Sequence, residues 1–210
     1  MDRLLLTRSD KNPILTPIKT ADHWWEAQCV FNPGAVVHEG RIHLLYRAMG
    51  DVHYSTFGLA VLSDPETVEK RFEKPFLEPD ETNPYEEFGV EDARITHMDG
   101  RYYIVYNGPS IYHAGTKKVN PWDHMHVPWR LRCSMAETAD FRSFKRHGVI
   151  LPDIDSKDGV LFPEKLQGKY ALLHRIFPDI YISYSEKLTY FGRGEVLCSV
   201  RSGGWDSERI

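Results

Sequence analysis

Three segments of the chain share one pattern of apolar and polar positions. Each begins with an apolar run, passes through a polar pair that ends in glycine, and continues with a basic residue and alternating aromatic and aliphatic residues. The segments are residues 34–48, 92–108 and 161–176, and their turn glycines are Gly40, Gly100 and Gly168. Polar turn residues between such runs predict β-hairpins.

A second apolar pattern follows each predicted hairpin, at residues 55–64, 129–138 and 179–188. Two of these patterns continue into charged stretches that contain an aromatic residue, such as Phe72 or Phe144, so each unit holds about four short strands, as a propeller blade does. Only residues 63–71 resemble a helix start, at Asp64-Pro65-Glu66, and a turn is equally compatible with them. Repetition of a four-strand unit predicts an all-β protein and favours a β-propeller over a sandwich.

The predicted domain organisation is a single β-propeller domain over residues 1–210. Residues 1–30 form an N-terminal strap with little periodicity, and the repeat units span about 31–88, 89–157 and 158–210. The tryptophan pair Trp24-Trp25 in the strap is better explained by packing than by stacking on a sugar, because large aromatic side chains are usually buried.

Composition and charge narrow the range of partners. The chain has 210 residues, 41% of them hydrophobic, which suits one sizeable soluble core. The 26 Lys+Arg residues nearly balance the 30 Asp+Glu residues, so neither nucleic acid nor a membrane is expected as a partner. Cys29, Cys133 and Cys198 lack paired spacing, and no signal or membrane segment is recognised. We therefore expect a soluble protein with reduced thiols in the cytoplasm.

Candidate chemistry gathers at the start of the second hairpin, where Glu91 and Asp92 are adjacent. In a propeller the first strand of each blade lines the channel, so equivalent strand ends converge on one pocket. Asn32 and Asp92 both lie eight residues before their turn glycine. The residues seven positions after the glycines are Arg47, Asn107 and Arg175. Acids, amides and cations around one axis suit an anionic or polyhydroxylated ligand.

These residues suit two kinds of glycosidic bond cleavage. Both need a general acid at the leaving oxygen, for which Asp92 beside Glu91 is the candidate, since neighbouring acids help a buried carboxyl group to keep its proton. A hydrolase adds a second carboxylate that activates water, and Glu164 and Asp158 are candidates. If phosphate attacks instead, the site needs several cations. The candidate cations are Arg47, Arg130, Lys165, His174 and Arg175.

Simpler explanations exist for individual residues. Arg94 could be a salt-bridge partner of Asp92, and Glu164-Lys165 could be a solvated pair on a rim. The loop histidines, at His113, His124 and His126, match no metal-site spacing, so no metal is expected.

Several motifs, in a fixed order, carry a resemblance to a known family. They are FNPGAV (31–36), LLYRA (44–48), GVEDARIT (89–96), DGVLFPEK (158–165), GKYALLHR (168–175) and GGWDSERI (203–210). Together they resemble glycoside hydrolase family 130, the β-mannoside phosphorylases and related mannosidases. The resemblance covers the chain from Asn32 to its last residue.

The resemblance implies an inverting phosphorolysis of β-mannosides. Asp92, in the family's Glu-Asp-x-Arg motif, would be the proton donor. Inorganic phosphate, as co-substrate and without a further cofactor, would attack the anomeric carbon and yield α-mannose 1-phosphate and an acceptor sugar. The implied phosphate-binding residues are Arg47, Arg130, Lys165 and His174. The expected substrate-binding residues are Asn32, Glu91 and Asp158, together with Asn107 from its place in the repeat.

The family's fold is a five-bladed β-propeller, whereas this chain supplies about three repeats and the approach to a fourth. The resemblance therefore predicts an incomplete propeller. A β-mannosidase that releases free mannose and a non-catalytic glycan-binding or assembly subunit stay open as alternatives. The sequence leaves the linkage, the acceptor sugar and a homo-oligomeric state undetermined.

Overall fold

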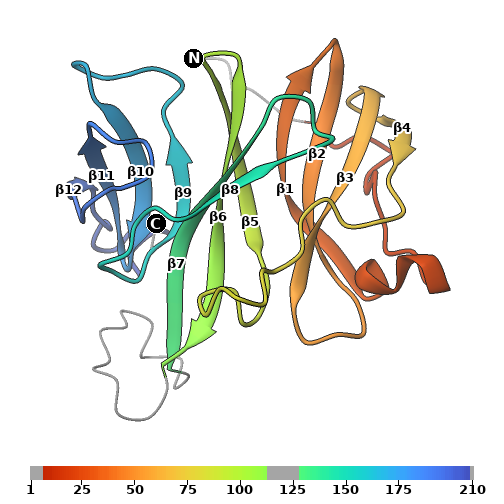
Figure 1. Ribbon diagram of the computed structural model, residues 1–210, viewed down its shortest axis with the longest axis horizontal. Helices are drawn as coiled ribbons and strands as arrows, with labels where there is room; N and C mark the ends of the chain where they lie inside the picture. Colours follow the sequence, from red (N-terminus) through yellow and green to blue (C-terminus); the bar gives the residue numbers. More distant parts are fainter. Residues whose placement is uncertain (1–6, 113–127, 209–210) are drawn as a thin grey trace.

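The protein is all-β and contains three four-stranded antiparallel sheets (Figure 1). The computed structural model describes residues 7–112 and 128–208. The first sheet consists of β1 (Cys29–His38), β2 (Arg41–Met49), β3 (Ser55–Asp64) and β4 (Thr67–Arg71). The second consists of β5 (Glu91–Met98), β6 (Arg101–Ile111), β7 (Trp129–Thr138) and β8 (Lys145–Val149). The third consists of β9 (Lys157–Leu161), β10 (Tyr170–Ile176), β11 (Asp179–Ser185) and β12 (Glu195–Cys198).

Strands follow each other in chain order within every sheet, as the repeated hairpins predicted. The first hairpin of each sheet closes through Glu39-Gly40, Asp99-Gly100 or Gln167-Gly168, and both residues of each pair have positive φ. Two consecutive left-handed residues give the turn whose twist matches paired strands. The three turn glycines therefore occupy the positions that the sequence pattern assigned to them.

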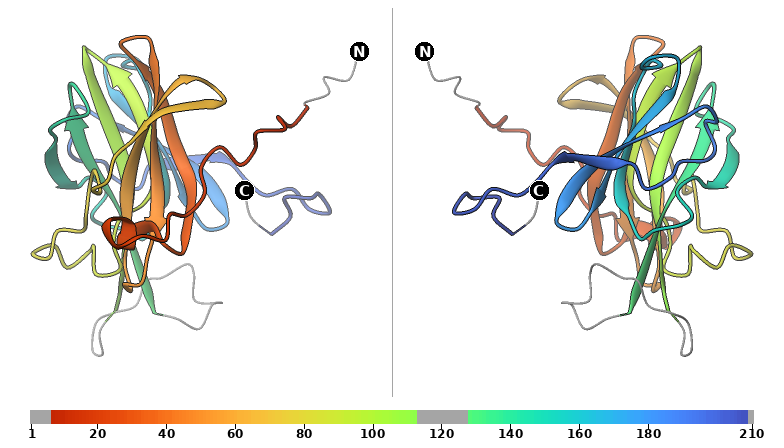
Figure 2. Two further views of the ribbon diagram at one scale, coloured as in Figure 1. Left: turned by 90° about the vertical axis from the view of Figure 1, so that its right-hand side faces the viewer. Right: turned by 90° about the vertical axis from the view of Figure 1, so that its left-hand side faces the viewer.

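The three sheets lie side by side like blades, with their first strands toward one another. β1 contacts β5, and β5 contacts β9, whereas β4 and β12 lie at opposite outer edges (Figures 1 and 2). The second sheet is packed on both faces: Ile104 belongs to the apolar core shared with the first sheet, and Val105 to the core shared with the third. Side chains alternate between the faces of a strand, so β6 can supply both cores.

Two expectations for the first 71 residues are now decided. Residues 63–71 form the β3–β4 hairpin rather than a helix; Asp64 Oδ1 accepts the Glu66 N–H at 2.8 Å and holds the turn. The strap contains the 3-10 helix η1 (Ala21–Glu26), in which Trp25 is buried, as expected from packing, whereas Trp24 is 40% exposed.

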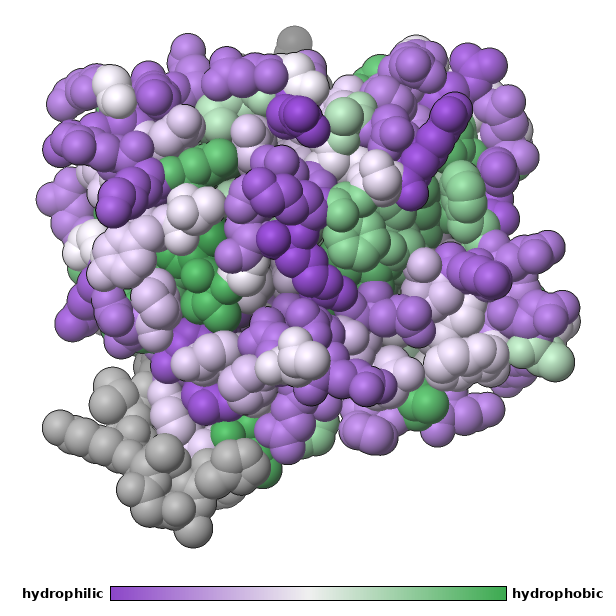
Figure 3. Space-filling model, in the orientation of Figure 1, coloured by the Kyte–Doolittle hydropathy of each residue, from purple (hydrophilic) through white to green (hydrophobic). Residues whose placement is uncertain are grey.

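The outer surface is mainly hydrophilic on the face viewed in Figure 3, with separate apolar patches between the polar side chains. No helix among residues 7–112 and 128–208 combines the length and apolarity needed to cross a membrane.

Candidate functional site

Each first strand carries a β-bulge near its beginning, and the bulged residue has a left-handed backbone. The φ angles are 45° at Asn32, 56° at Asp92 and 57° at Asp158, a region that short polar side chains tolerate better than bulky ones. A bulge turns its side chain away from the regular strand alternation. In each sheet, the position just before the bulge pairs with a residue of the second strand. These second-strand residues are Arg47, Asn107 and Arg175. We call these six side chains, together with Glu91, the ring.

The first two sheets meet at Asp92. One carboxylate oxygen, Oδ1, accepts a hydrogen bond from Asn32 Nδ2 at 2.9 Å and one from Arg47 Nη1 at 3.4 Å. Arg47 Nη2 also contacts Glu91 Oε1 at 2.5 Å. One guanidinium group therefore serves two adjacent carboxylates, and a residue from the neighbouring sheet orients the more buried one, Asp92, which is 7% exposed.

Burial sets the electrostatics of this part of the ring. It raises the pKa of Glu91 above the ordinary value of a glutamate, because the charged form loses hydration; the charges of Asp92 and Asp158 act in the same direction. The positive charges of Arg47 and Lys157 oppose that shift. The ring can therefore hold a proton at Glu91 more easily than an exposed glutamate could.

The second and third sheets meet at Asn107. Its Oδ1 accepts the backbone N–H of Asp158 at 3.0 Å, and Arg175 Nη2 pairs with Asp158 Oδ2 at 2.8 Å. Asn107 is 1% exposed, and its Nδ2 has no hydrogen-bond partner among the described residues; the buried Nε of Arg47 is in the same state. Buried donors are costly when unsatisfied, so both groups are suited to oxygen atoms of a ligand.

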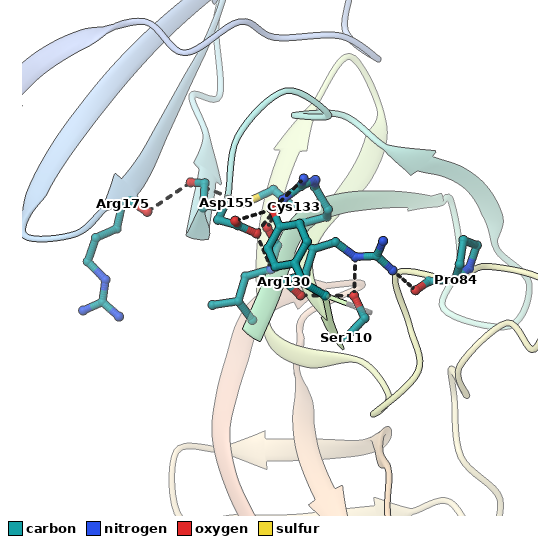
Figure 4. Close-up of polar contacts among 10 residues, drawn as sticks. Pro84, Ser110, Arg130, Cys133, Asp155 and Arg175 are labelled. Atoms are coloured by element: carbon teal, nitrogen blue, oxygen red, sulfur yellow. Dashed lines mark hydrogen bonds and ion pairs between the residues drawn. The ribbon is translucent and has the colours of Figure 1, made fainter. Parts of the chain in front are cut away.

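Arg130, one of the predicted phosphate ligands, makes its contacts at the rim of the second sheet. Its Nε donates to Ser110 Oγ at 2.8 Å, and its Nη2 donates to the Pro84 carbonyl oxygen at 2.6 Å (Figure 4). The guanidinium carbon lies 4.5 Å from the centre of the Tyr85 ring. These contacts tie Arg130 to the loop before β5 rather than to the ring residues, and its phosphate role stays a prediction.

Lys165 and His174 also make contacts outside the ring. Lys165 is exposed beyond the end of β9, in the β9–β10 connection, with Nζ 4.4 Å from the centre of the Tyr170 ring. His174 is 1% exposed and lies between the hydroxyl groups of Ser156 and Ser183. The predicted phosphate roles of Lys165 and His174 therefore stay predictions.

A comparison with known families identifies the family of the chain. The model of glycoside hydrolase family 130, described as beta-1,4-mannooligosaccharide phosphorylase, matches residues 6–210. The chain belongs to glycoside hydrolase family 130. The expected family membership is thereby confirmed.

Curated relatives within the family are phosphorylases from Thermoanaerobacter sp. (strain X514). The chain is 36% identical to a beta-1,2-mannobiose phosphorylase, covering 98% of this chain and 66% of that protein. It is 32% identical to a 1,2-beta-oligomannan phosphorylase, covering 98% of this chain and 65% of that protein. The chain thus spans about two thirds of the length of these relatives.

A solved structure supports the fold. The beta-1,2-mannobiose phosphorylase of Listeria innocua, in complex with beta-1,2-mannobiose, matches with a TM-score of 0.75 at 26% sequence identity. The match covers 96% of this chain and 69% of that chain. The three blade-like sheets of this chain are therefore a family 130 arrangement.

Counting residues back from the turn glycines did not show that Asp158 is equivalent to Asn32 and Asp92. Eight residues before Gly168 stands Val160, because the β9–β10 connection is longer than the other two turns. The available signal was Asp158-Gly159, a short polar residue that tolerates the left-handed bulge. Equivalent positions in the three sheets are found from the pairing register of the strands rather than from the distance to the turn glycine.

A buried carboxylate that the sequence analysis did not single out anchors the first sheet. Glu26 is fully buried and accepts a hydrogen bond from the Tyr46 hydroxyl at 2.8 Å; it also pairs with Arg71 Nη2 at 2.6 Å. Glu26 precedes β1, Tyr46 lies on β2 and Arg71 on β4. We call these three residues the first clamp, because they tie the segment before the first strand to the rest of its sheet.

The second sheet repeats this arrangement. Glu86 is buried, accepts a hydrogen bond from the Tyr106 hydroxyl at 2.9 Å and pairs with Arg146 Nη1 at 2.9 Å. We call these three residues the second clamp. Glu86 stands six residues before Asp92, as Glu26 stands before Asn32, so each clamp fixes the approach to a ring residue.

Two further expectations concern neighbours of the site. Arg94 Nη1 donates to the carbonyl oxygens of Asp92 and Ala93 at 3.4 and 3.1 Å, so these bonds support the bulge backbone rather than the Asp92 carboxylate. Within the part of the chain that the structure describes, no group of three or more His, Cys, Asp or Glu residues could hold a metal ion. The histidines His113, His124 and His126 lie outside the described residues.

Proposed function

We propose that the chain carries the general acid of a β-mannoside phosphorylase, and that this acid is Asp92. The observation that supports this most strongly is the ring: Asp92 is buried, oriented by Asn32 and Arg47, and adjacent to buried N–H groups that have no partner in the described protein. A sugar or phosphate oxygen would satisfy those donors. The names of the two Thermoanaerobacter relatives support phosphorolysis as the reaction.

The reaction replaces one bond at the anomeric carbon of mannose with another. A phosphate oxygen attacks that carbon from the face opposite the leaving group, and the bond to the acceptor sugar's oxygen breaks. Asp92 supplies the proton, through a sugar hydroxyl, that converts the leaving oxygen into a hydroxyl group. The products are α-mannose 1-phosphate and the shortened acceptor, and phosphate needs no separate base to become nucleophilic.

The roles of the other ring residues follow from their charges and hydrogen-bonding capacity. Asn32, Glu91, Asn107 and Asp158 are proposed to contact the sugar, because amides and carboxylates suit its hydroxyl groups. Arg47 is proposed to bind phosphate on its free Nε side while it holds the two carboxylates. Arg130, Lys165 and His174, at their positions outside the ring, carry weaker support for phosphate binding.

The propeller is proposed to have five blades, with the three sheets as its first three within a single domain of residues 1–210. The predicted repeat units, 31–88, 89–157 and 158–210, each contain nearly all of one sheet, although β1 begins at Cys29 and β9 at Lys157. A cytoplasmic location stays a prediction based on the three cysteines, which are free thiols.

The alternative reaction is hydrolysis. One solved structure of this fold, with a TM-score of 0.78, is named "The GH130 family of mannoside phosphorylases contains glycoside hydrolases that target beta-1,2 mannosidic linkages in Candida mannan". Carboxylates are available in the ring for water activation. The observation that favours phosphorolysis is the cationic character of Arg47 and Arg175 at matched positions of the first and third sheets.

The test is product analysis with β-1,2-mannobiose, with and without inorganic phosphate. We expect mannose 1-phosphate only when phosphate is present, and a loss of about 10²–10⁴-fold in rate for Asp92→Asn, the range for removal of a general acid. Asp99→Asn is the matched control, because Asp99 is exposed in the hairpin turn and Asn tolerates its left-handed backbone.

Two results would contradict this proposal. Free mannose released independently of phosphate would favour the β-mannosidase. Mannobiose binding in calorimetry without turnover would favour a glycan-binding subunit.

A further inference from the structure

His174 occupies the position in the third sheet that a clamp tyrosine occupies in the other two. Tyr46, Tyr106 and His174 each stand immediately before a ring residue on the second strand of their sheet. In the first two sheets the tyrosine reaches a buried glutamate. In the third sheet the imidazole reaches the hydroxyl groups of Ser156 and Ser183 instead.

The hydrogen bonds around His174 show which ring nitrogen donates. The Ser183 hydroxyl donates to the Gly192 carbonyl oxygen at 2.7 Å, so its oxygen accepts the bond from His174 Nε2 at 2.8 Å. Ser156 Oγ lies 2.9 Å from Nδ1, and its hydroxyl hydrogen has both Nδ1 and the Arg175 carbonyl oxygen as acceptors. Because Nε2 donates to Ser183, a neutral imidazole carries its hydrogen on Nε2 and offers Nδ1 to the Ser156 hydroxyl.

The surroundings of His174 favour the neutral form. Burial lowers the pKa of the imidazole to about 4, and a hydrogen bond to the Arg193 backbone only partly opposes this. Its ring stacks on Tyr181 of β11 at a centroid distance of 5.8 Å. Arg175, the neighbouring residue on β10, directs its charge to Asp158.

Ser156 connects His174 to the ring. It stands two residues before Asp158, and its N–H donates to the Leu131 carbonyl oxygen at 3.2 Å. Its hydroxyl group also donates to the Arg175 carbonyl oxygen at 3.1 Å. The Cys133 sulfur lies 4.0 Å from both Ser156 Oγ and Asn107 Oδ1. The start of β9, and with it the bulge at Asp158, is thereby tied to His174.

We propose that His174 is a positioning residue that holds Asp158 in the ring through Ser156 and does not contact phosphate. The inference rests on the proposed function, in which Asp158 contacts the sugar. The His174 side chain touches neither substrate, so the effect of His174 is transmitted through the backbone of residues 156–158. We therefore expect changes at His174 to raise the KM for the mannoside and to leave the KM for phosphate unchanged.

Two conservative variants separate the two hydrogen bonds of the imidazole. His174→Asn keeps an amide near the Nδ1 position, which faces Ser156, and His174→Gln keeps one near the Nε2 position, which faces Ser183. We expect Ser156→Ala and His174→Gln to raise the KM for β-1,2-mannobiose about five- to tenfold, as the loss of one hydrogen bond predicts. His174→Asn should raise this KM less, because its amide remains near Ser156. The KM for phosphate should stay within about twofold in all three variants.

Steady-state rates with each substrate varied in turn provide the test, and Arg47→Lys provides the control that raises the KM for phosphate. A rise in the phosphate KM at His174→Asn or His174→Gln, with the mannobiose KM unchanged, would make His174 a phosphate ligand and overturn the proposal. An unchanged mannobiose KM in Ser156→Ala would overturn it as well.

A spectroscopic measurement distinguishes failure of this inference from failure of the proposed function. If the unaltered chain shows no turnover, the proposed function fails, and long-range ¹H–¹⁵N spectra of the imidazoles still decide the state of His174. We expect an Nε2–H tautomer between pH 7 and pH 5, a shift of the Nδ1 resonance in Ser156→Ala, and no response to inorganic phosphate. Titration near the ordinary histidine pKa, or a shift on adding phosphate, would refute the proposal.

Discussion

The first two sheets and the third anchor the approach to the ring by different means. The clamps of the first two sheets use a buried glutamate, a tyrosine hydroxyl and an arginine from the fourth strand. The third sheet uses a neutral imidazole between two serine hydroxyls. The approach to the ring is therefore anchored by a charged cluster in the first two sheets and by an uncharged cluster in the third.

The difference shows how the charge and the hydrogen-bonding groups of each anchor are satisfied. A buried carboxylate needs a counterion and several donors, which Arg71 and Tyr46 supply in the first clamp. Burial and the charge of Glu26 raise the pKa of the Tyr46 hydroxyl, so it stays a donor. The imidazole needs no counterion, but its bonding depends on remaining unprotonated. The clamps should therefore respond most to loss of a partner, and the third sheet to acid.

The largest effect is expected from opening the second clamp. Glu86→Ala leaves Arg146 in a partly buried site without its carboxylate, and we expect the free energy of unfolding to fall by about 3–5 kcal/mol. Urea unfolding followed by tryptophan fluorescence measures the change. Glu87→Ala is the control, because the Glu87 side chain is exposed. A loss below 1 kcal/mol in Glu86→Ala would mean that the clamp does not anchor the sheet.

Acid should act on the third sheet. Because the native pKa of His174 is about 4, below the 6.5 of an unfolded histidine, only the unfolded state binds the proton between these values. Stability is therefore lost as the pH falls from 6.5 toward 4. We expect His174 to contribute a loss of about 2 kcal/mol between pH 7.5 and pH 5.

The matched variant is His174→Gln, which cannot titrate in this range. Urea unfolding of both proteins at the two pH values gives the difference. Equal losses in the two proteins would show that His174 titrates as in the unfolded chain.

A smaller effect should follow removal of a clamp hydroxyl. Tyr46→Phe and Tyr106→Phe each delete one hydrogen bond to a buried carboxylate that keeps its arginine and one hydrogen bond from that arginine, so we expect about 1.5 kcal/mol lower stability. Tyr190→Phe is the control, because the Tyr190 side chain is exposed and its hydroxyl donates to Asp153. This variant should change stability by less than about 0.5 kcal/mol. Unequal losses in the two clamp variants would show that the clamps are not equivalent.

The smallest effect is expected at an exposed ion pair on the same blade as the first clamp. Arg41 Nε and Glu69 Oε2 lie 2.7 Å apart with about half of each side chain exposed. We expect Arg41→Ala to reduce stability by about 0.5 kcal/mol or less, because solvent and salt screen the pair. A loss comparable to that of Glu86→Ala would remove the distinction between buried and exposed charge pairs in this fold.

Much of the fold could be predicted because its signals are local. Turn glycines at positions 40, 100 and 168, between alternating apolar residues, predicted three hairpins and a four-strand repeat, and the structure confirms both. The match between Asn32 and Asp92 also came from counting along the chain. Their side chains lie within hydrogen-bond distance although 60 positions separate them.

The sequence by itself thus determined the hairpins, the repeat and the family, since turn chemistry and strand alternation act over a few residues. Only the tertiary structure decided which side chains meet. The bulge brought Asp158 to the ring, and strand alternation directed His174 away from Arg175 and toward two serines. Glu26 and Glu86 became anchors through partners from distant strands. Such pairings depend on register and burial, which short-range patterns do not specify.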